Sequence, residues 1–125
     1  SQDNPLKIGE IGTMSPITTH VLDTANGCPA QGVAITLEVQ EGDQWTTLYE
    51  GSTNSDGRVT DLMQVGDLQA ATYRITFHTQ AYFAQQNAPV FYPYVPVTFQ
   101  ISSPTEHYHI PLLISPFGYS TYRGS

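Results

Sequence analysis

The sequence predicts an all-β fold, an eight-stranded antiparallel β-sandwich with one short helix. Short runs rich in Val, Ile, Thr, Tyr and Phe recur at intervals of roughly ten residues, and Gly, Asn, Asp and Pro separate them. Runs of this kind are typical of antiparallel sandwiches. The 125 residues also match the usual size of one domain, which is large enough to bury a core.

Eight stretches have the alternation and the β-branched or aromatic residues that strands favour. In chain order they are residues 17–23, 33–40, 45–50, 58–61, 72–78, 95–101, 107–113 and 119–123. Pro96 lies inside an otherwise regular strand, and because proline donates no backbone hydrogen bond we expect an edge position there. An edge strand of this kind often pairs with another subunit.

Two stretches depart from the strand pattern. Residues 79–87 contain aromatic and glutamine side chains at helical spacing and no Gly or Pro, so they predict the short helix. Residues 1–16 have no clear period and contain two prolines and two glycines. We therefore expect a flexible N-terminal arm at residues 1–16 and a sandwich domain at residues 17–125.

The charge balance excludes several classes of partner. Eleven acidic residues against four Lys and Arg give a net charge of -7, which disfavours binding to nucleic acid or to an anionic membrane. No apolar run approaches the roughly 20 residues that span a bilayer, and one cysteine, Cys28, allows no internal disulfide. We expect a soluble protein, in the cytoplasm first, with the peroxisome or the periplasm as alternatives.

The histidines have a defined geometry on the predicted strands. Side chains alternate across a strand, so His107 and His109 share one face while Tyr108, Ile110 and Leu112 take the other. The apolar set belongs to the core, and the two histidines therefore face water or a partner subunit.

A third histidine has the same kind of position. His20 shares a face with Thr18 and Leu22, opposite the apolar positions of its strand. Together with His107 and His109 it could hold a divalent metal ion, although no carboxylate accompanies the three. Acid-base chemistry near neutral pH is the other possibility, and we favour it over a metal site.

One cation and the last residues complete the candidate site. Arg58 follows the turn Asn54-Ser55-Asp56-Gly57, in which Asp-Gly supplies the positive φ angle of a tight turn. The sequence ends in Tyr122-Arg123-Gly124-Ser125, an unusual concentration of donors and acceptors for one short strand.

Four segments resemble the motifs of the transthyretin-related proteins, in the same order and with suitable spacing. They are ITTHVLDT at residues 17–24, TNSDGR at 53–58, FYP at 91–93, and HYHIPLL at 107–113 followed by YRGS at 122–125. The terminal tetrapeptide resembles that of the 5-hydroxyisourate hydrolases within this family, whereas the hormone carriers end differently.

The resemblance implies a cofactor-free and metal-free hydrolase that opens 5-hydroxyisourate to 2-oxo-4-hydroxy-4-carboxy-5-ureidoimidazoline. It also implies a homotetramer, a dimer of dimers, with the active sites at the dimer–dimer interface. The implied catalytic residues are His20, Arg58, His109 and Ser125, the last through its hydroxyl or carboxylate.

The resemblance assigns substrate binding to the rest of the C-terminal tetrapeptide. These residues are Tyr122, Arg123 and Gly124, and Tyr122 would close the floor of the channel. His107 lies nearer the start of its strand, and we expect it to be solvated or to support the other histidines.

Two other functions stay open at this stage. The first is a transthyretin-like carrier of aromatic small molecules such as iodothyronines. The second is a structural β-sandwich module appended to a surface protein. Hormone binding without hydrolysis would favour the carrier, and a stable monomer would favour the module.

Overall fold

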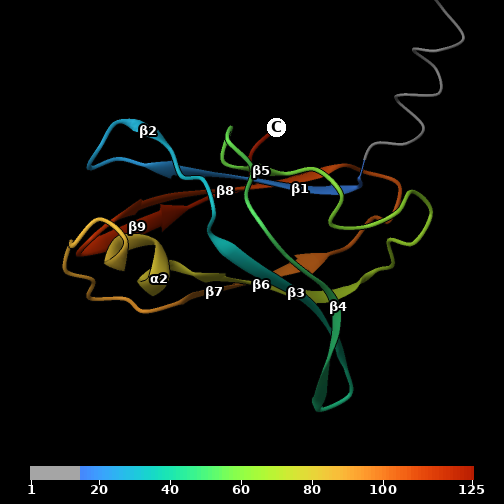
Figure 1. Ribbon diagram of the computed structural model, residues 1–125. Helices are drawn as coiled ribbons and strands as arrows, with labels where there is room; N and C mark the ends of the chain where they lie inside the picture. The colour runs from blue at the N-terminus through green and yellow to red at the C-terminus, as the bar shows by residue number, and fades with distance from the viewer. Residues whose placement is uncertain (1–14) are drawn as a thin grey trace, which may run out of the picture.

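The computed structural model describes residues 15–125 and confirms the β-sandwich (Figure 1). One sheet has the strand order β2-β1-β8-β9, with β5 also paired to β1, and the other has the order β4-β3-β6-β7. The elements are β1 (Ile17–Asp23), β2 (Cys28–Pro29), β3 (Ala34–Glu41), β4 (Gln44–Ser52), β5 (Arg58–Val59), β6 (Ala71–His78), α2 (Thr79–Ala84), β7 (Val95–Ile101), β8 (Tyr108–Ser115) and β9 (Gly118–Thr121).

Most strands lie where the sequence predicts them, and two features were not expected. The two-residue strand β2 pairs with the end of β1, which brings the strands among residues 15–125 to nine. The pair β1 and β8 is parallel, whereas every other strand pair within a sheet is antiparallel. A parallel pair is possible here because the strands β3 to β7 connect β1 to β8, so no tight hairpin is required.

The core lies between the two sheets and follows the predicted alternation. In β8, Tyr108, Ile110 and Leu112 are buried as expected. The largest fully buried side chains include Tyr73, Phe77, Phe83, Ile17, Ile35, Leu37, Ile75 and Ile101. Strands β7 and β9 end their sheets, which confirms the edge position expected from Pro96.

A buried carboxylate fastens the helix to the sheet that carries the histidines. Asp23 is 1% exposed and accepts hydrogen bonds from the Tyr82 hydroxyl at 2.6 Å and from the Asn26 side chain at 2.8 Å. The amides of Ala25 and Asn26 donate to its other oxygen. Burial raises the pKa of Asp23, but these hydrogen bonds outweigh it and the net pKa is lowered.

The start of the described chain is tied to the same sheet. Tyr108 donates its amide to the Pro16 carbonyl at 2.8 Å, and the buried Ser15 hydroxyl accepts from the Met63 amide at 3.2 Å. The remainder of the predicted arm, residues 1–14, lies outside the described residues. The helix in the described part of the chain is too short to cross a membrane.

Candidate active site

Three strands of one sheet bring the predicted site residues to a common outer face. In the parallel pair β1 and β8, Thr18 lies opposite His109. In the antiparallel pair β1 and β5, His20 lies opposite Arg58. Residues opposite one another in a sheet point to the same side, so strand pairing alone places these four side chains together.

The position of Arg58 depends on the turn that the sequence predicts. The Asn54 side chain accepts hydrogen bonds from the amides of Asp56 at 2.9 Å and Arg58 at 3.0 Å. Gly57 has φ +74°, and a Cβ atom there would lie 2.4 Å from the Val21 carbonyl oxygen. Only glycine fits this contact, and it holds the turn against β1 with Arg58 beside His20.

His109 is the half-buried member of the histidine group. Its Nδ1 atom lies 2.8 Å from the Thr18 hydroxyl, and the same hydroxyl lies 3.2 Å from Nε2 of the exposed His107. Burial lowers the pKa of His109, and the nearby charges of Arg58, His107 and His20 lower it further. The ring therefore stays neutral, and able to accept a proton, to a lower pH than an ordinary histidine.

The C-terminal tail, residues 122–125, packs directly against the His109 ring. Gly124 donates its amide to the His109 carbonyl at 2.9 Å, and the two residues form an antiparallel bridge. A Cβ atom on Gly124 would lie 2.7 Å from His109 Cδ2. The tail therefore needs glycine at this position so that the backbone can approach the imidazole.

Ser125 follows at the edge of a shallow hollow. The hollow has a volume of about 390 Å³ and is lined by residues that include Thr18, Arg58, His107, His109 and Ser125. Figure 1 shows the C-terminus on the outer side of this sheet, beside β5. Imidazole, guanidinium and hydroxyl groups thus surround one space, which suits acid-base chemistry on a polar anion.

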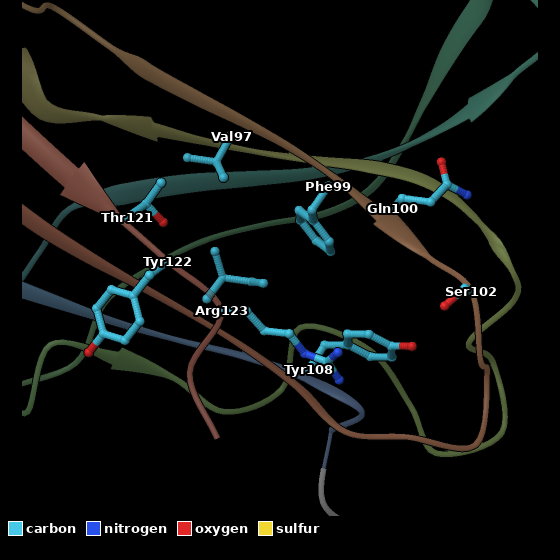
Figure 2. A pocket seen from close by; sticks show the side chains of 9 residues that line it. Val97, Phe99, Gln100, Ser102, Tyr108, Thr121, Tyr122 and Arg123 are labelled. Carbon is cyan, nitrogen blue, oxygen red and sulfur yellow. The ribbon is translucent and has the colours of Figure 1, made fainter.

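Arg123 lies away from this group. Its guanidinium stacks 4.4 Å from the centre of the Tyr108 ring and donates to the Glu106 carboxylate at 2.9 Å. Figure 2 shows it lining a second hollow, of about 280 Å³, between β7 and the last strand. Its contact with substrate stays a prediction.

Tyr122 follows β9 directly and lines the same hollow as Arg123. Figure 2 shows its ring pointing away from the Arg123 guanidinium, and the residue is 58% exposed. Because Ser120 lies opposite Leu113 and Gly124 opposite His109, alternation places Tyr122 on the face of His109.

One residue of the group was missed at the level of sequence. Thr18 contacts both histidines of β8, and its shared face with His20 was the signal that could have identified it. Among residues 15–125 no group of three or more His, Cys, Asp and Glu side chains is arranged to hold a metal ion.

The two sheets and the cluster on the outer face of β1, β5 and β8 define a transthyretin-like β-sandwich with a polar site. Residues 17–124 match the HIUase/Transthyretin family, and the chain belongs to that family. The resemblance found in the sequence motifs is thereby confirmed.

Individual relatives agree with this assignment. The chain is 46% identical over 113 residues to the 5-hydroxyisourate hydrolase of Mus musculus, covering 89% of this chain and 96% of the relative. It is similar to the structure of Klebsiella pneumoniae 5-hydroxyisourate hydrolase, with a TM-score of 0.75, 36% identity, and 90% and 99% of the two chains covered. Sea bream transthyretin in complex with thyroxine has a TM-score of 0.83 at 32% identity, with 88% and 95% covered.

Proposed function

We propose that this protein hydrolyses 5-hydroxyisourate to 2-oxo-4-hydroxy-4-carboxy-5-ureidoimidazoline in urate degradation. The observation that carries the proposal is the convergence of His20, Arg58 and His109 on one outer face, beside a hollow that Arg58 and His109 line. The relatives named 5-hydroxyisourate hydrolase support the same reaction.

The proposed chemistry assigns a role to each group. His109, kept neutral by its environment, takes a proton from water with the help of His20, and the hydroxide adds to a ring carbonyl. Arg58 stabilises the oxyanion that forms. The lactam C–N bond then breaks, the leaving ring nitrogen takes the proton that His109 removed from water, and the former carbonyl carbon stays in the opened product as its carboxylate. Acid-base help of this kind contributes about 10²- to 10⁴-fold to the rate.

The tail contributes the rest of the proposed site. Ser125 orients His109 from the edge of the hollow, Gly124 allows the tail to reach the ring, and Tyr122 closes one side. Substrate contact by Arg123 stays a prediction, because its guanidinium is paired with Glu106 in the single chain.

The proposal includes a homotetramer, a dimer of dimers. The edge strands β7 and β9 lie on the same side of the sandwich, and among residues 15–125 no strand pairs with the outer edge of either, so a second copy can continue both sheets. The site is open on the outer face of its sheet, and a facing dimer would supply the other wall. A cytoplasmic location, with peroxisome and periplasm as alternatives, stays a prediction.

A carrier of aromatic small molecules is the alternative, since the similar sea bream transthyretin is described in complex with thyroxine. The imidazole and guanidinium groups on the face of β1, β5 and β8 disfavour it, because a large apolar ligand would leave these groups without hydrogen-bond partners.

The deciding experiment follows the ultraviolet absorbance of 5-hydroxyisourate made freshly by urate oxidase. We expect the protein to accelerate its decay, and we expect His109→Asn to lose most of that acceleration. Unchanged decay together with tight thyroxine binding would replace the hydrolase by the carrier.

A further inference from the structure

The C-terminal tail reaches His109 beyond the end of its strand. The ladder between β8 and β9 ends at Thr121, and Gly124 then forms an isolated bridge with His109. The last residues of a chain fray unless they are tied down. A tail that keeps Gly124 and Ser125 beside an imidazole therefore needs an anchor near its end.

Arg123 makes two side-chain contacts that can serve as this anchor. Its guanidinium lies 4.4 Å from the centre of the Tyr108 ring and donates to the Glu106 carboxylate at 2.9 Å. The Tyr108 ring is a fixed platform, because it is buried and its hydroxyl donates to the Ser103 carbonyl at 2.9 Å. The ion pair alone would stabilise little, since both its side chains are 56% exposed, but the stacked ring adds to it.

The same contacts direct Arg123 away from the hollow beside His109. Tyr108 and His109 are neighbours in β8, so their side chains point to opposite faces of the sheet. The guanidinium lies against the Tyr108 ring, as Figure 2 shows. Within the described chain, the arginine that lines the hollow beside His109 is Arg58.

We propose that Arg123 is a positioning residue that clamps the C-terminal tail to the Tyr108 ring and to Glu106, and so holds Gly124 and Ser125 beside His109. This role does not need the contact with substrate that is predicted for Arg123. It rests on the proposed function for its effect on catalysis, but the attachment of the tail can be measured without any substrate.

Hydrogen exchange of the Gly124 amide, followed by NMR in the full-length protein, measures how firmly the tail is held. This amide donates to the His109 carbonyl at 2.9 Å and is protected while the tail is in place. Arg123→Met keeps an apolar stem and removes the guanidinium. Loss of one exposed cation–π contact and one exposed ion pair should speed the exchange about 3- to 30-fold. Arg123→Lys keeps the charge and should restore part of the protection. Unchanged exchange in Arg123→Met would overturn the proposal.

Arg74→Met is the matched control, because Arg74 has the same two kinds of partner in the other sheet. Its guanidinium lies 4.1 Å from the centre of the Trp45 ring and 2.8 Å from the Glu38 carboxylate. Its replacement should leave both the exchange of the Gly124 amide and the hydrolysis of 5-hydroxyisourate unchanged in the folded protein. Equal effects of Arg74→Met and Arg123→Met would overturn the clamp, since they would report a general loss of stability.

Glu106→Gln separates a clamp from a direct contact with substrate. The substitution releases the Arg123 guanidinium from its carboxylate partner. If Arg123 bound the substrate, its release should lower KM. A clamp instead predicts faster exchange of the Gly124 amide and a kcat lowered by up to about 5-fold, the equivalent of one exposed ion pair, at an unchanged KM. A lowered KM with unchanged exchange would overturn the proposal in favour of the predicted contact.

A chain without residues 124–125 gives the last readout. If Arg123 acts by holding these two residues, Arg123→Met should lower kcat in the full chain and have no further effect in the shortened chain. Additive losses would overturn the proposal. If wild type itself does not accelerate the decay of 5-hydroxyisourate, the proposed function fails, and the exchange of the Gly124 amide still decides whether Arg123 holds the tail.

Discussion

Replacing Gly124 with alanine tests the geometry of the site without removing any functional group. The added Cβ atom would lie 2.7 Å from His109 Cδ2 and 3.3 Å from Pro111 Cγ. Carbon atoms in contact are normally about 3.5–4.0 Å apart, so the ring or the tail must move by about 0.8 Å. Either movement changes how His109 faces the hollow and Ser125.

The expected cost follows from this displacement. A misplacement of about 1 Å in a catalytic arrangement can lower the rate about 10²-fold. We therefore expect Gly124→Ala to lower kcat/KM for 5-hydroxyisourate by about 100-fold. Overpacking typically costs about 1–3 kcal/mol of stability, so the variant should still fold and assemble.

The assay is stopped-flow ultraviolet detection of freshly made 5-hydroxyisourate, with urea unfolding measured in parallel. Gly118→Ala is the matched control, because Gly118 opens β9, the strand that leads into the C-terminal tail, and its Cβ atom would meet only the Ser115 hydroxyl oxygen, at 3.8 Å. We expect the control to hydrolyse at the wild-type rate. Equal activity of the two alanine variants would refute the argument from close packing on His109.

Three further predictions concern the histidines and the buried carboxylate. In the same absorbance assay, His109→Asn should lower kcat by about 10²- to 10⁴-fold, and His107→Asn by about tenfold or less. Equal losses would contradict the assignment of His109 as the general base. Because the pKa of His109 is lowered from 6.5, activity should persist to pH values below 6.5 and disappear as pH falls through the lowered pKa; a pH–rate profile with its acidic midpoint above 6.5 would contradict this. Tyr82→Phe should cost about 1.5–3 kcal/mol at neutral pH, since it removes a hydrogen bond to a buried carboxylate. The pKa of Asp23 is lower in the folded protein than its unfolded value of 3.8, so the ionised carboxylate stabilises the fold at pH values above 3.8. This stabilisation is lost as the pH falls through the folded pKa. The loss of unfolding free energy caused by Tyr82→Phe, measured by urea unfolding, should therefore be smaller at acidic than at neutral pH. An equal loss at both pH values would contradict the role given to the Tyr82–Asp23 hydrogen bond.

The sequence predicted those features of the site that depend on alternation within one strand. His20 and His109 face outward because their neighbours Val21, Ile110 and Leu112 are apolar and must be buried. The position of Arg58 was also foreseeable, because Asp-Gly turn chemistry is local.

Features that depend on pairing between distant strands were not predicted. The parallel pairing of β1 with β8 sets Thr18 opposite His109, and no local pattern encodes a partner so far along the chain. The direction of the Arg123 side chain could not be predicted, for a related reason. Its side chain is held by Glu106 and by the Tyr108 ring, and a motif carries no information on which neighbour a long flexible side chain selects.

The pairing of β1 with β8 has a consequence for how the protein acquires activity. Thr18 and His109 are 91 positions apart, so the proposed site of proton transfer exists only after the earliest and nearly the latest segments of the domain have met. Contacts of such long range form slowly, since a large loop must close first. Turnover during refolding would therefore lag behind the appearance of the β3–β4 hairpin and would report completion of the whole sandwich. A nascent chain whose β8 segment has not yet left the ribosome would be inactive, even if its first strands were already folded.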